Sequence, residues 1–504
     1  MRSSEVLLTA FMLTAAVSGC TVGPDFRQPD APTTTRYTAP GESRARAADA
    51  GTAAARQTVV LGAKVTSAWW TLFRSPDLDR LVKQSIADSP TLEAAKARLV
   101  AARDTVTATT GALYPQIGFS ASATREKVTA ATFGLHPDAV PLPPNFNLFQ
   151  IGPTVSYALD LFGGTRRQIE QAAALAAVQR DTLDAAYLAL TGNVVIEAVD
   201  VGAIRAQQKA VNDTLDIDRQ NLALVRRERQ AGTVPDSDVV TAETQLATDE
   251  TQLPGLDQQL SVARHALAVL LGRAPGDWSP PDFDLAALTL PGQLPVSLPS
   301  ELVHQRPDIQ AAEARLHTAS AQIGVATAQL YPSITLSGSV GAAGLDGGHL
   351  FDPAGLVWSI AAGLTQPIFD GGTRLAERRA ALALFKAAAA DYRQTVLQAF
   401  GQVADILQAL THDADLLAAQ QHALDLASEA VRLQRANYAN GGTGILALLD
   451  SQRQYQQARL GYVRAEAQRY QDTIQLLVAM GGGWWGAHLT VANNNNQPQE
   501  THRD

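Results

Sequence analysis

Few side chains in this chain of 504 residues could do catalytic chemistry. Its nine histidines are scattered, and no two have the i, i+4 spacing of a metalloprotease HExxH helix. Neither a G-x-S-x-G nucleophile elbow nor a phosphate-binding Walker loop occurs. The single cysteine, Cys20, rules out an internal disulfide framework and any metal cluster built from cysteines. The sequence therefore predicts a protein that is not an enzyme and that holds neither a metal ion nor a dissociable cofactor.

Cys20 follows an apolar run, Val6 to Val17, which has the length of a signal peptide and is too short to span a bilayer. The run ends in Val17-Ser18-Gly19-Cys20, which resembles a bacterial lipobox, whose cysteine is lipidated. The alternative is a chance cysteine at the end of an ordinary secretion signal, but Cys20 is the only cysteine and lies where cleavage should occur. We expect residues 1–19 to be removed and Cys20 to carry a covalent lipid. Thr21 in the next position, by the same resemblance, favours delivery to the outer membrane.

A charged pair occurs near the C-terminus, on a predicted helix that begins after Gly444. Leu446, Asp450 and Arg453 are spaced four and three residues apart, so they share one helix face. The spacing alone indicates no more than an ordinary solvated ion pair.

Composition excludes several classes of protein. Apolar residues make up 46% of the chain and charged residues 18%, and the net charge is −9, which argues against binding of nucleic acid. Beyond residue 20, no stretch approaches the roughly 20 apolar residues of a transmembrane helix.

The elements that position these residues occur twice. Residues 90–99 match residues 307–316 at six of ten positions, with an offset of 217. Two further marks recur in the same order: Tyr114-Pro115 as Tyr331-Pro332, and Gly163-Gly164-Thr165-Arg166 as Gly371-Gly372-Thr373-Arg374. A proline-rich connector separates the copies. We interpret the chain as two copies of one unit.

Each copy contains the same series of elements. An alanine-rich helix (about 90–113, then 307–330) precedes two β segments, in which apolar residues alternate with small or polar ones. A long helix follows (165 to about 231, then 373 to about 440), with apolar residues every three or four positions and a length of about 100 Å. A turn at 232–235 or 441–444 returns the chain as a shorter helix, to about Leu271 or Ala479. At each Gly-Gly-Thr-Arg turn we prefer a strand-to-helix turn capped by Thr165 or Thr373 over an anion cradle.

The β segments and long helices of one chain are too few to form a closed structure by themselves. The alternation is typical of outer-membrane barrel strands, although a small soluble sheet would show it too. Four strands cannot close a barrel, and lipid does not tolerate an open edge. Three chains would supply twelve strands. The alanine-rich rods also carry a thin apolar stripe, which suits side-by-side packing in a cylinder of helices.

The chain resembles the TolC-type outer-membrane factors, in the lipoprotein (NodT/OprM-like) branch that serves tripartite efflux pumps of the RND type. The resemblance rests on residues 19–26, Trp69-Trp70 with the segment to Leu78, Arg306-Pro307-Asp308-Ile309, both Gly-Gly-Thr-Arg turns and residues 448–453. It implies a fold that is mainly α with membrane β: a trimeric, twelve-stranded outer-membrane β-barrel continued by a long periplasmic α-helical barrel. The partners implied are two further copies of the chain, a periplasmic adaptor, an inner-membrane RND-type transporter and outer-membrane lipid.

The resemblance also implies a role for the charged pair. In that family the stretch after the second turn lines the periplasmic constriction, so a threefold ring of Asp450, with Leu446 and Arg453, is our hypothesis for a gate. In the first copy Glu243 falls at a similar place, but Leu246 stands where the arginine would be.

The predicted domain plan follows from these assignments. It comprises a signal peptide (1–19), a lipidated extended segment (20–68), a first repeat (69–273, with strands near 114–125 and 147–162), a connector (274–300), a second repeat (301–481, with strands near 331–342 and 356–369) and a flexible tail (482–504). We expect passive efflux of small molecules. The alternatives are a duct for type I polypeptide secretion or metal-cation efflux, or, in another class, a structural coiled-coil lipoprotein.

Overall fold

The computed structural model describes residues 21–39, 57–127, 145–348 and 350–482. The chain divides into two compact units. Residues 1–29, 98–179 and 312–392 form what we call the strand unit, and residues 30–97, 180–311 and 393–504 form the hairpin unit. The signal peptide, Cys20 and almost all of the predicted tail lie outside the described residues.

Helices predominate in the described part of the chain. The helices are η2 (Trp69–Phe73), α2 (Pro76–Asp88), α3 (Pro90–Gly111), α4 (Gly164–Gln230), α5 (Asp236–Glu250), α6 (Gln252–Leu270), η4 (Leu285–Ala287), α7 (Pro299–Leu302), α8 (Pro307–Ala328), η5 (Pro353–Gly355), α9 (Thr373–Ala439) and α10 (Ile445–Ala479). The strands are β1 (Thr58–Leu61), β2 (Gln116–Glu126), β3 (Phe146–Leu159), β4 (Gln293–Val296), β5 (Ser333–Gly344) and β6 (Leu356–Thr365).

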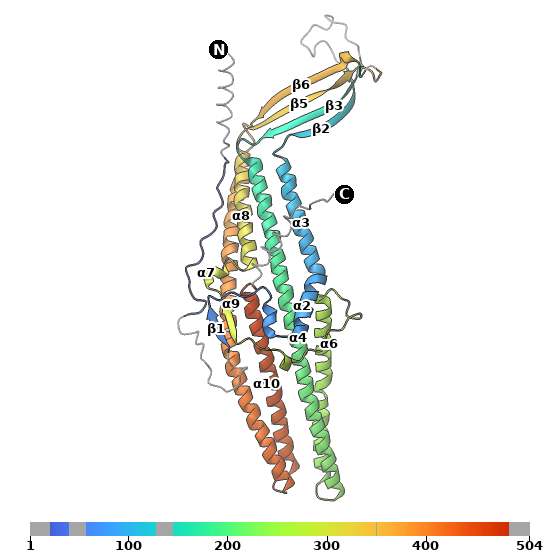
Figure 1. The fold of residues 1–504 in the computed structure, drawn as a ribbon, viewed down its shortest axis with the longest axis vertical. Coiled ribbons are helices and arrows are strands. Elements are labelled where there is room, and N and C mark those ends of the chain that lie inside the picture. The colour runs from blue at the N-terminus through green and yellow to red at the C-terminus, as the bar shows by residue number, and fades with distance from the viewer. Residues whose placement is uncertain (1–20, 40–56, 128–144, 349, 483–504) are drawn as a thin grey trace, which may run out of the picture. The chain divides into compact units, whose positions relative to one another are not determined.

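The strand unit contains one four-stranded sheet in the order β2-β3-β5-β6, with every neighbouring pair antiparallel (Figure 1). The two strands from each sequence repeat are adjacent, and the repeats meet where β3 pairs with β5. Strands β2 and β6 form the edges of the sheet, and all of their residues are exposed in the single chain.

The register gives the sheet two chemically different faces, because residues that pair directly across strands share a face. Ile117 pairs with Val155, Val155 with Gly338, and Gly338 with Ile360. The face that contains these residues is apolar and also carries Phe119, Ile151, Leu336, Val340, Trp358 and Leu364. The other face consists mainly of small or polar residues, including Ser120, Thr154, Ser337, Ser339, Ser359 and Thr365. On the polar face, the hydroxyls of Ser339 and Ser359 lie 2.8 Å apart.

The backbones of the two repeats approach closely at the β3–β5 seam. A Cβ atom added to Gly152 would lie 2.2 Å from the carbonyl oxygen of Val340, and one added to Gly341 would lie 2.2 Å from that of Ile151. Neither distance is compatible with a side chain, so glycine is required on both sides. Pro153 beside Gly152 has no N–H to donate and accompanies a gap in the pairing at this place.

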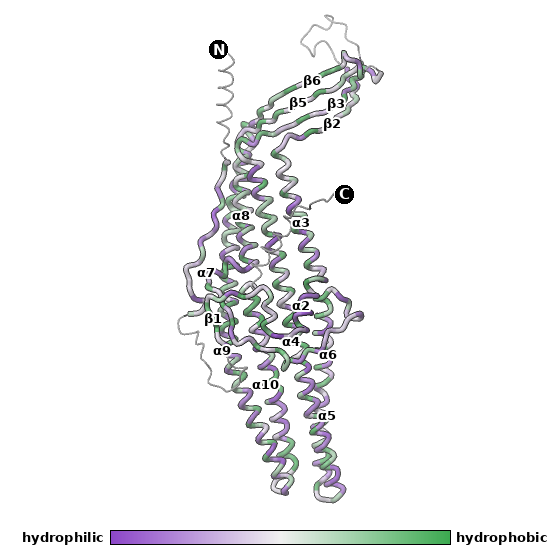
Figure 2. The backbone as a smooth tube through the Cα atoms, in the orientation of Figure 1, coloured by the Kyte–Doolittle hydropathy of each residue, from purple (hydrophilic) through white to green (hydrophobic). Residues whose placement is uncertain are grey.

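The long helices match the expected lengths closely, since α4 and α9 each contain 67 residues. Figure 2 shows hydrophobic and hydrophilic residues interspersed along them. The expectation that no stretch beyond residue 20 is apolar enough to cross a membrane was wrong: among the described residues, α4 alone has such a window. More than half of that window is buried inside the structure, and Val194, Val195 and Val199 have no exposed surface. We therefore interpret it as a core helix.

The returning helix of the first copy differs from the expected single rod that ends near Leu271. It is divided into α5 and α6 at Thr251. Pro254 explains the break, because it has no N–H to bond the carbonyl of Glu250 and its ring clashes with that carbonyl in a continuous helix. The second copy has no proline in this stretch, and α10 runs unbroken for 35 residues.

The hairpin unit has a mixed core in which the connector participates. Trp69 and Phe73 of η2 are buried, and Phe73 packs on Tyr470 of α10 with ring centroids 6.3 Å apart. Strand β1 pairs in parallel with β4 of the connector, an element that the sequence analysis did not predict. Arg469 of α10 is 2% exposed, and its Nε donates to the side-chain oxygen of Gln57 at 3.0 Å. The segment before β1 is thus fastened to α10.

Candidate functional site

The two turns that join the long helices to the returning helices have the same backbone geometry. In the first, the N–H of Thr233 donates to the carbonyl of Glu228 and that of Gly232 to Arg229. In the second, Gly442 donates to Asn437 and Gly441 to Tyr438. Gly232 and Gly441 have φ of 76° and 70°, so both helices end in a Schellman motif, which glycine favours.

A compact apolar cluster lies beneath these turns and orients the first turn of α10. Ile445, Leu448 and Leu449 of α10 are buried against Leu222 and Val225 of α4 and Ala242 of α5. Because these residues occupy one face of α10, the residues between them must point elsewhere.

The three predicted gate residues lie on that other face. The side chain of Leu446 is 57% exposed in the single chain. Asp450 and Arg453 form an ion pair with 2.6 Å between Oδ1 and Nη2, and each side chain is 51% exposed. The hydrogen bond from Arg453 is the main reason that the pKa of Asp450 is lowered, so this carboxylate stays ionised at neutral pH. The face is free to meet an aqueous passage or a neighbouring chain.

Glu243, the predicted counterpart in the first copy, has an arginine partner that sequence spacing did not reveal. Nη2 of Arg226, on α4, lies 2.6 Å from Oε1 of Glu243 on α5. In the first copy the positive charge therefore comes from Arg226 on the facing helix α4. In the second copy it comes from Arg453, three residues after Asp450 on the same helix. Glu243 and Asp450 thus have different arginine partners, Arg226 and Arg453.

Polar contacts fasten the second hairpin to α4, and none of them was predicted. Asn221 donates to Gln452 at 2.6 Å, and Arg459 forms an ion pair with Asp213 at 2.5 Å. The hydroxyl of Tyr438 donates to Glu228. Gln471 of α10 also donates to Asp200 of α4. Both residues line a cavity of about 740 Å³ between α4, α6 and α10. Of these residues only Asn221 and Gln452 are buried, and no sequence signal pointed to their pairing.

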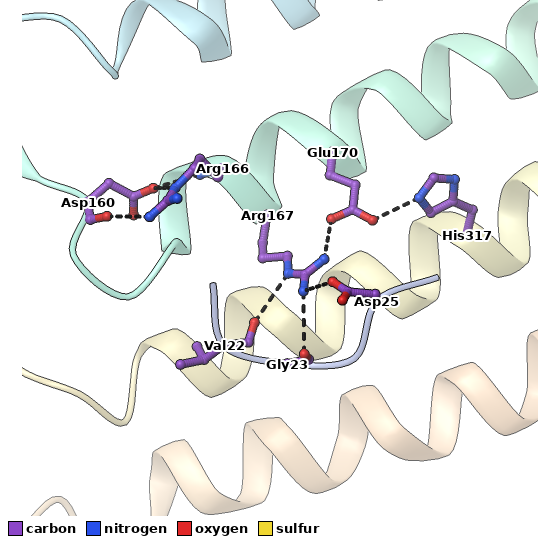
Figure 3. A network of polar contacts seen from close by, with 8 residues as sticks. All are labelled: Val22, Gly23, Asp25, Asp160, Arg166, Arg167, Glu170 and His317. Carbon is purple, nitrogen blue, oxygen red and sulfur yellow. Dashed lines mark hydrogen bonds and ion pairs between the residues drawn. The ribbon is translucent and has the colours of Figure 1, made fainter. Parts of the chain in front are cut away.

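The Gly-Gly-Thr-Arg turns begin helices as predicted, but the expected capping residues were wrong. Thr165 already lies inside α4, and its N–H donates to the carboxylate of Asp160 at 2.9 Å (Figure 3 shows Asp160 with Arg166). At the second turn Asp370 accepts from the N–H groups of Gly372 and Arg374, and Thr373 is the first residue of α9. A carboxylate accepts two N–H groups where a threonine hydroxyl would cap one, which explains the choice of aspartate at both helix N-termini.

Gly163 and Gly371 supply the sharp bends at these turns, with φ of 76° and 66°. Gly372 also has a positive φ, of 88°, whereas Gly164 is the first residue of α4. Within the described residues, no group of three or more His, Cys, Asp or Glu side chains is placed to hold a metal ion.

Two buried carboxylates face each other at the α5–α6 break. Asp218 of α4 and Asp249 of α5 are each 3% exposed, and Asp249 is among the groups that raise the pKa of Asp218. Asp249 also accepts from Gln245 and Gln252, on either side of the break. Burial and the neighbouring Asp249 raise the pKa of Asp218 to about 7. The carboxyl group of Asp218 is therefore partly protonated at neutral pH.

With this geometry established, known proteins provide a comparison. A profile of the outer membrane efflux protein family matches residues 81–273 and 298–482. The chain is similar to pyoverdine export outer membrane protein OpmQ of Pseudomonas aeruginosa, with 31% identity covering 86% of this chain and 92% of the relative. It is similar to nodulation protein T of Rhizobium leguminosarum bv. viciae, with 29% identity and 98% of both chains covered. The outer-membrane channel OprN has a TM-score of 0.82 at 30% identity, covering 92% of this chain and all of that one.

The family match spans well over half of the chain in two segments, one for each sequence repeat. The chain belongs to the outer membrane efflux protein family. It is an outer-membrane efflux channel whose helices extend into the periplasm, with the mainly helical fold and membrane strands of the outer-membrane factors. The family suggested by the sequence motifs is thereby confirmed.

The Asp218–Asp249 pair predicts a stability that falls as the pH rises. The folded chain holds the proton of Asp218 more tightly than the unfolded chain does, because the pKa rises from 3.8 to about 7 on folding. The resulting stabilisation is complete below about pH 4 and is lost as the pH rises through 7. Asp218→Asn, which cannot titrate, should flatten the decline in thermal unfolding temperature between pH 6 and 8. The control is Asp216→Asn, an exposed carboxylate on the same helix, which should keep the wild-type slope. An unchanged slope in Asp218→Asn would contradict the assignment.

Proposed function

We propose that three copies of this chain close one channel that conducts small molecules passively across the outer membrane. The observation that carries the proposal is the sheet of the strand unit, which has an apolar face, a polar face and two unpaired edges. In lipid each unpaired backbone group costs several kcal/mol, so the edges of β2 and β6 need partners.

The directions of the strands support closure by further copies of the same chain. Every neighbouring pair in the sheet is antiparallel, so the two edge strands run in opposite directions. Strand β6 of one copy can therefore pair with β2 of the next and continue the antiparallel pattern. Three copies supply twelve strands, an even number wide enough to enclose a lumen. The apolar face then meets lipid, and the small and polar residues line the passage.

The exposed helix faces support a partnered assembly below the membrane. In the single chain, α9 exposes Leu384, Leu397 and Leu426, which are 58–63% accessible along its length. Side-by-side packing of α4, α9 and the returning helices from three copies would cover such residues and continue the passage into the periplasm.

The proposal includes the partners of a tripartite pump. A periplasmic adaptor contacts the helical end, an inner-membrane RND-type transporter supplies the energy, and a lipid on Cys20 adds an anchor. One relative is named for pyoverdine export, which supports a small organic cargo. We assign the choice of cargo to the transporter, because a passive lumen of small polar residues discriminates weakly.

Native mass spectrometry in detergent tests the assembly, combined with conductance in a planar bilayer. We expect a mass of three chains and discrete channel openings. A monomer without conductance would contradict the proposal and favour a structural lipoprotein, whereas a conducting trimer that exports a polypeptide would favour type I secretion.

Two adjacent residues on β6 test the assignment of the faces. Ile360 is on the apolar face and 83% exposed, and Ser359 is on the polar face. Ile360→Arg should prevent insertion, because an arginine on the lipid face costs about 2–4 kcal/mol near the bilayer midplane in each copy. Ser359→Arg should insert and shift the ion selectivity of the channel towards anions. Outer-membrane fractionation measures the insertion of each variant, and the reversal potential measures the ion selectivity. Equal insertion of the two variants would refute the assignment of the faces.

We also propose that Leu446, Asp450 and Arg453 form the periplasmic gate, with Glu243 and Arg226 beside it. Three copies would bring the exposed α10 faces together, where like charges repel and each Arg453 can bridge to the Asp450 of its own or the next chain. The ion pair within one chain is exposed and contributes little to stability by itself, so its value lies in closing the aperture.

Removal of the pair should raise single-channel conductance. The double variant Asp450→Ala with Arg453→Ala leaves no charges to lock the aperture, and the result is read in a planar bilayer at moderate salt. The matched control is Glu429→Ala with Arg432→Ala, an exposed ion pair of the same i, i+3 spacing and 2.6 Å length on α9, which should leave conductance unchanged. Unchanged conductance in the α10 variant would exclude the gate.

A further inference from the structure

The first described residues of the chain occupy a built site on the strand unit. Figure 3 shows Arg167 of α4 reaching to the segment that carries Val22, Gly23 and Asp25. Its guanidinium donates to the carbonyl oxygens of Val22 at 3.2 Å and Gly23 at 3.4 Å, and it forms an ion pair with Asp25 at 2.7 Å. All of these partners belong to an extended segment without secondary structure of its own.

The segment fits this site without room for larger residues. Gly23 has φ of 94°, and a Cβ atom there would lie 2.5 Å from the Cα of Gly324 on α8. A Cβ on Gly324 would in turn lie 2.6 Å from Cγ of Arg167. A Cβ on Gly163 would lie 2.4 Å from a methyl group of Thr21. Three glycines thus bring the segment, α8 and the start of α4 into direct backbone contact.

Further contacts extend the site to residue 28. The ring of Phe26 stacks on that of His317 with centroids 4.2 Å apart, and Gln28 donates to Glu313 at 3.2 Å. Glu170 holds both sides together, since it lies 2.6 Å from Arg167 and 2.8 Å from His317.

Arg167 is 4% exposed and stays charged in this site. Burial alone would lower its pKa, but the hydrogen bonds that Arg167 donates to Glu170 and Asp25 outweigh burial and raise the pKa. A lysine could not reproduce the arrangement, because one ammonium group cannot reach two carbonyls and two carboxylates at these separate positions. A buried guanidinium with four partners thus holds a segment that is otherwise largely exposed, which indicates that the position of this segment matters.

The position of the segment suggests what it is held for. The N–H of Val22 donates to the carbonyl of Phe162, just after the end of β3, and Phe162 stacks on Tyr331 just before β5. Aromatic residues of this kind mark the membrane–water interface of outer-membrane strands. Val22 follows Cys20 by two residues in the sequence, and two residues of chain span at most about 7 Å.

We propose that Arg167, Glu170, His317, Gly163 and Gly324 form an anchor seat, which binds residues 21–28 and fixes the depth at which the lipidated N-terminus enters the membrane. The inference rests on the proposed lipid at Cys20. Arg167 acts as a positioning residue. The seat places the acyl chains beside the end of the sheet, so that the lipid and the strands enter the same leaflet in register.

Trypsin cleavage after Arg27 tests whether the seat holds the segment. Arg27 is exposed, and cleavage there requires the segment to leave its site. Arg167→Ala and Gly23→Ala should each accelerate this cleavage by roughly tenfold or more in the folded protein, from the loss of charge-assisted hydrogen bonds or of the fit. Gly23→Ala alters only the segment and leaves α4 and α8 intact. The matched control is Arg166→Ala, whose described contacts are to Asp160, and it should be cleaved at the wild-type rate. Wild-type rates in both seat variants would overturn the proposal.

A double-variant comparison separates anchoring from general stability. Arg167→Ala is made in the natural chain and in a chain whose residues 1–20 are replaced by a cleavable secretion signal that is not lipidated. If the seat acts through the anchor, the variant reduces the outer-membrane fraction only in the natural chain. Equal reductions in both backgrounds would overturn the proposal in favour of a structural role. Mass spectrometry of the N-terminal peptide checks the lipid, so absence of the lipid is distinguished from failure of the seat.

Discussion

The backbone polar groups along the outer edges of β2 and β6 impose the constraint on which the rest of the structure depends. A strand edge can face water, but it cannot face hydrocarbon without a partner. One chain offers four strands with an apolar face, too few to close on themselves. Three other features also fit a chain that is one part of a larger, closed assembly. They are the exposed leucines of α9, the exposed face of α10 at Asp450, and the opposite directions of the two edge strands.

Much of the fold was predictable because duplication and periodicity leave strong local signals. The long helices were expected at 165–231 and 373–440, and they run from Gly164 to Gln230 and from Thr373 to Ala439. Period-two alternation indicated the apolar and polar sets of strand residues, and the register places those sets on opposite faces. Both signals depend only on residues that are neighbours in sequence, which is why they could be interpreted without coordinates.

The remaining features depend on contacts between residues that are distant in sequence. Arg226 of α4 pairs with Glu243 of α5, and Asp218 of α4 is close enough to Asp249 of α5 for that carboxylate to raise its pKa. No spacing rule reveals such partners. The helix caps show a different limitation: threonine and aspartate are both good capping residues, and only the path of the turn decides that Asp160 and Asp370, rather than Thr165 and Thr373, reach the free N–H groups. The β1–β4 pair was missed because strands of four residues, one of them containing Pro295, carry almost no periodic signal.

The break at Thr251 has a consequence for symmetry. Two copies of one unit in each of three chains would give a ring of six equivalent hairpins, and such a ring has no preferred place to deform. Pro254 makes one hairpin of each chain jointed, while α10 keeps the other continuous. In the proposed trimer the ring would therefore alternate continuous and jointed hairpins, and its symmetry would be threefold rather than sixfold. A change in diameter would concentrate at three joints, leaving the α10 faces to move as rigid bodies.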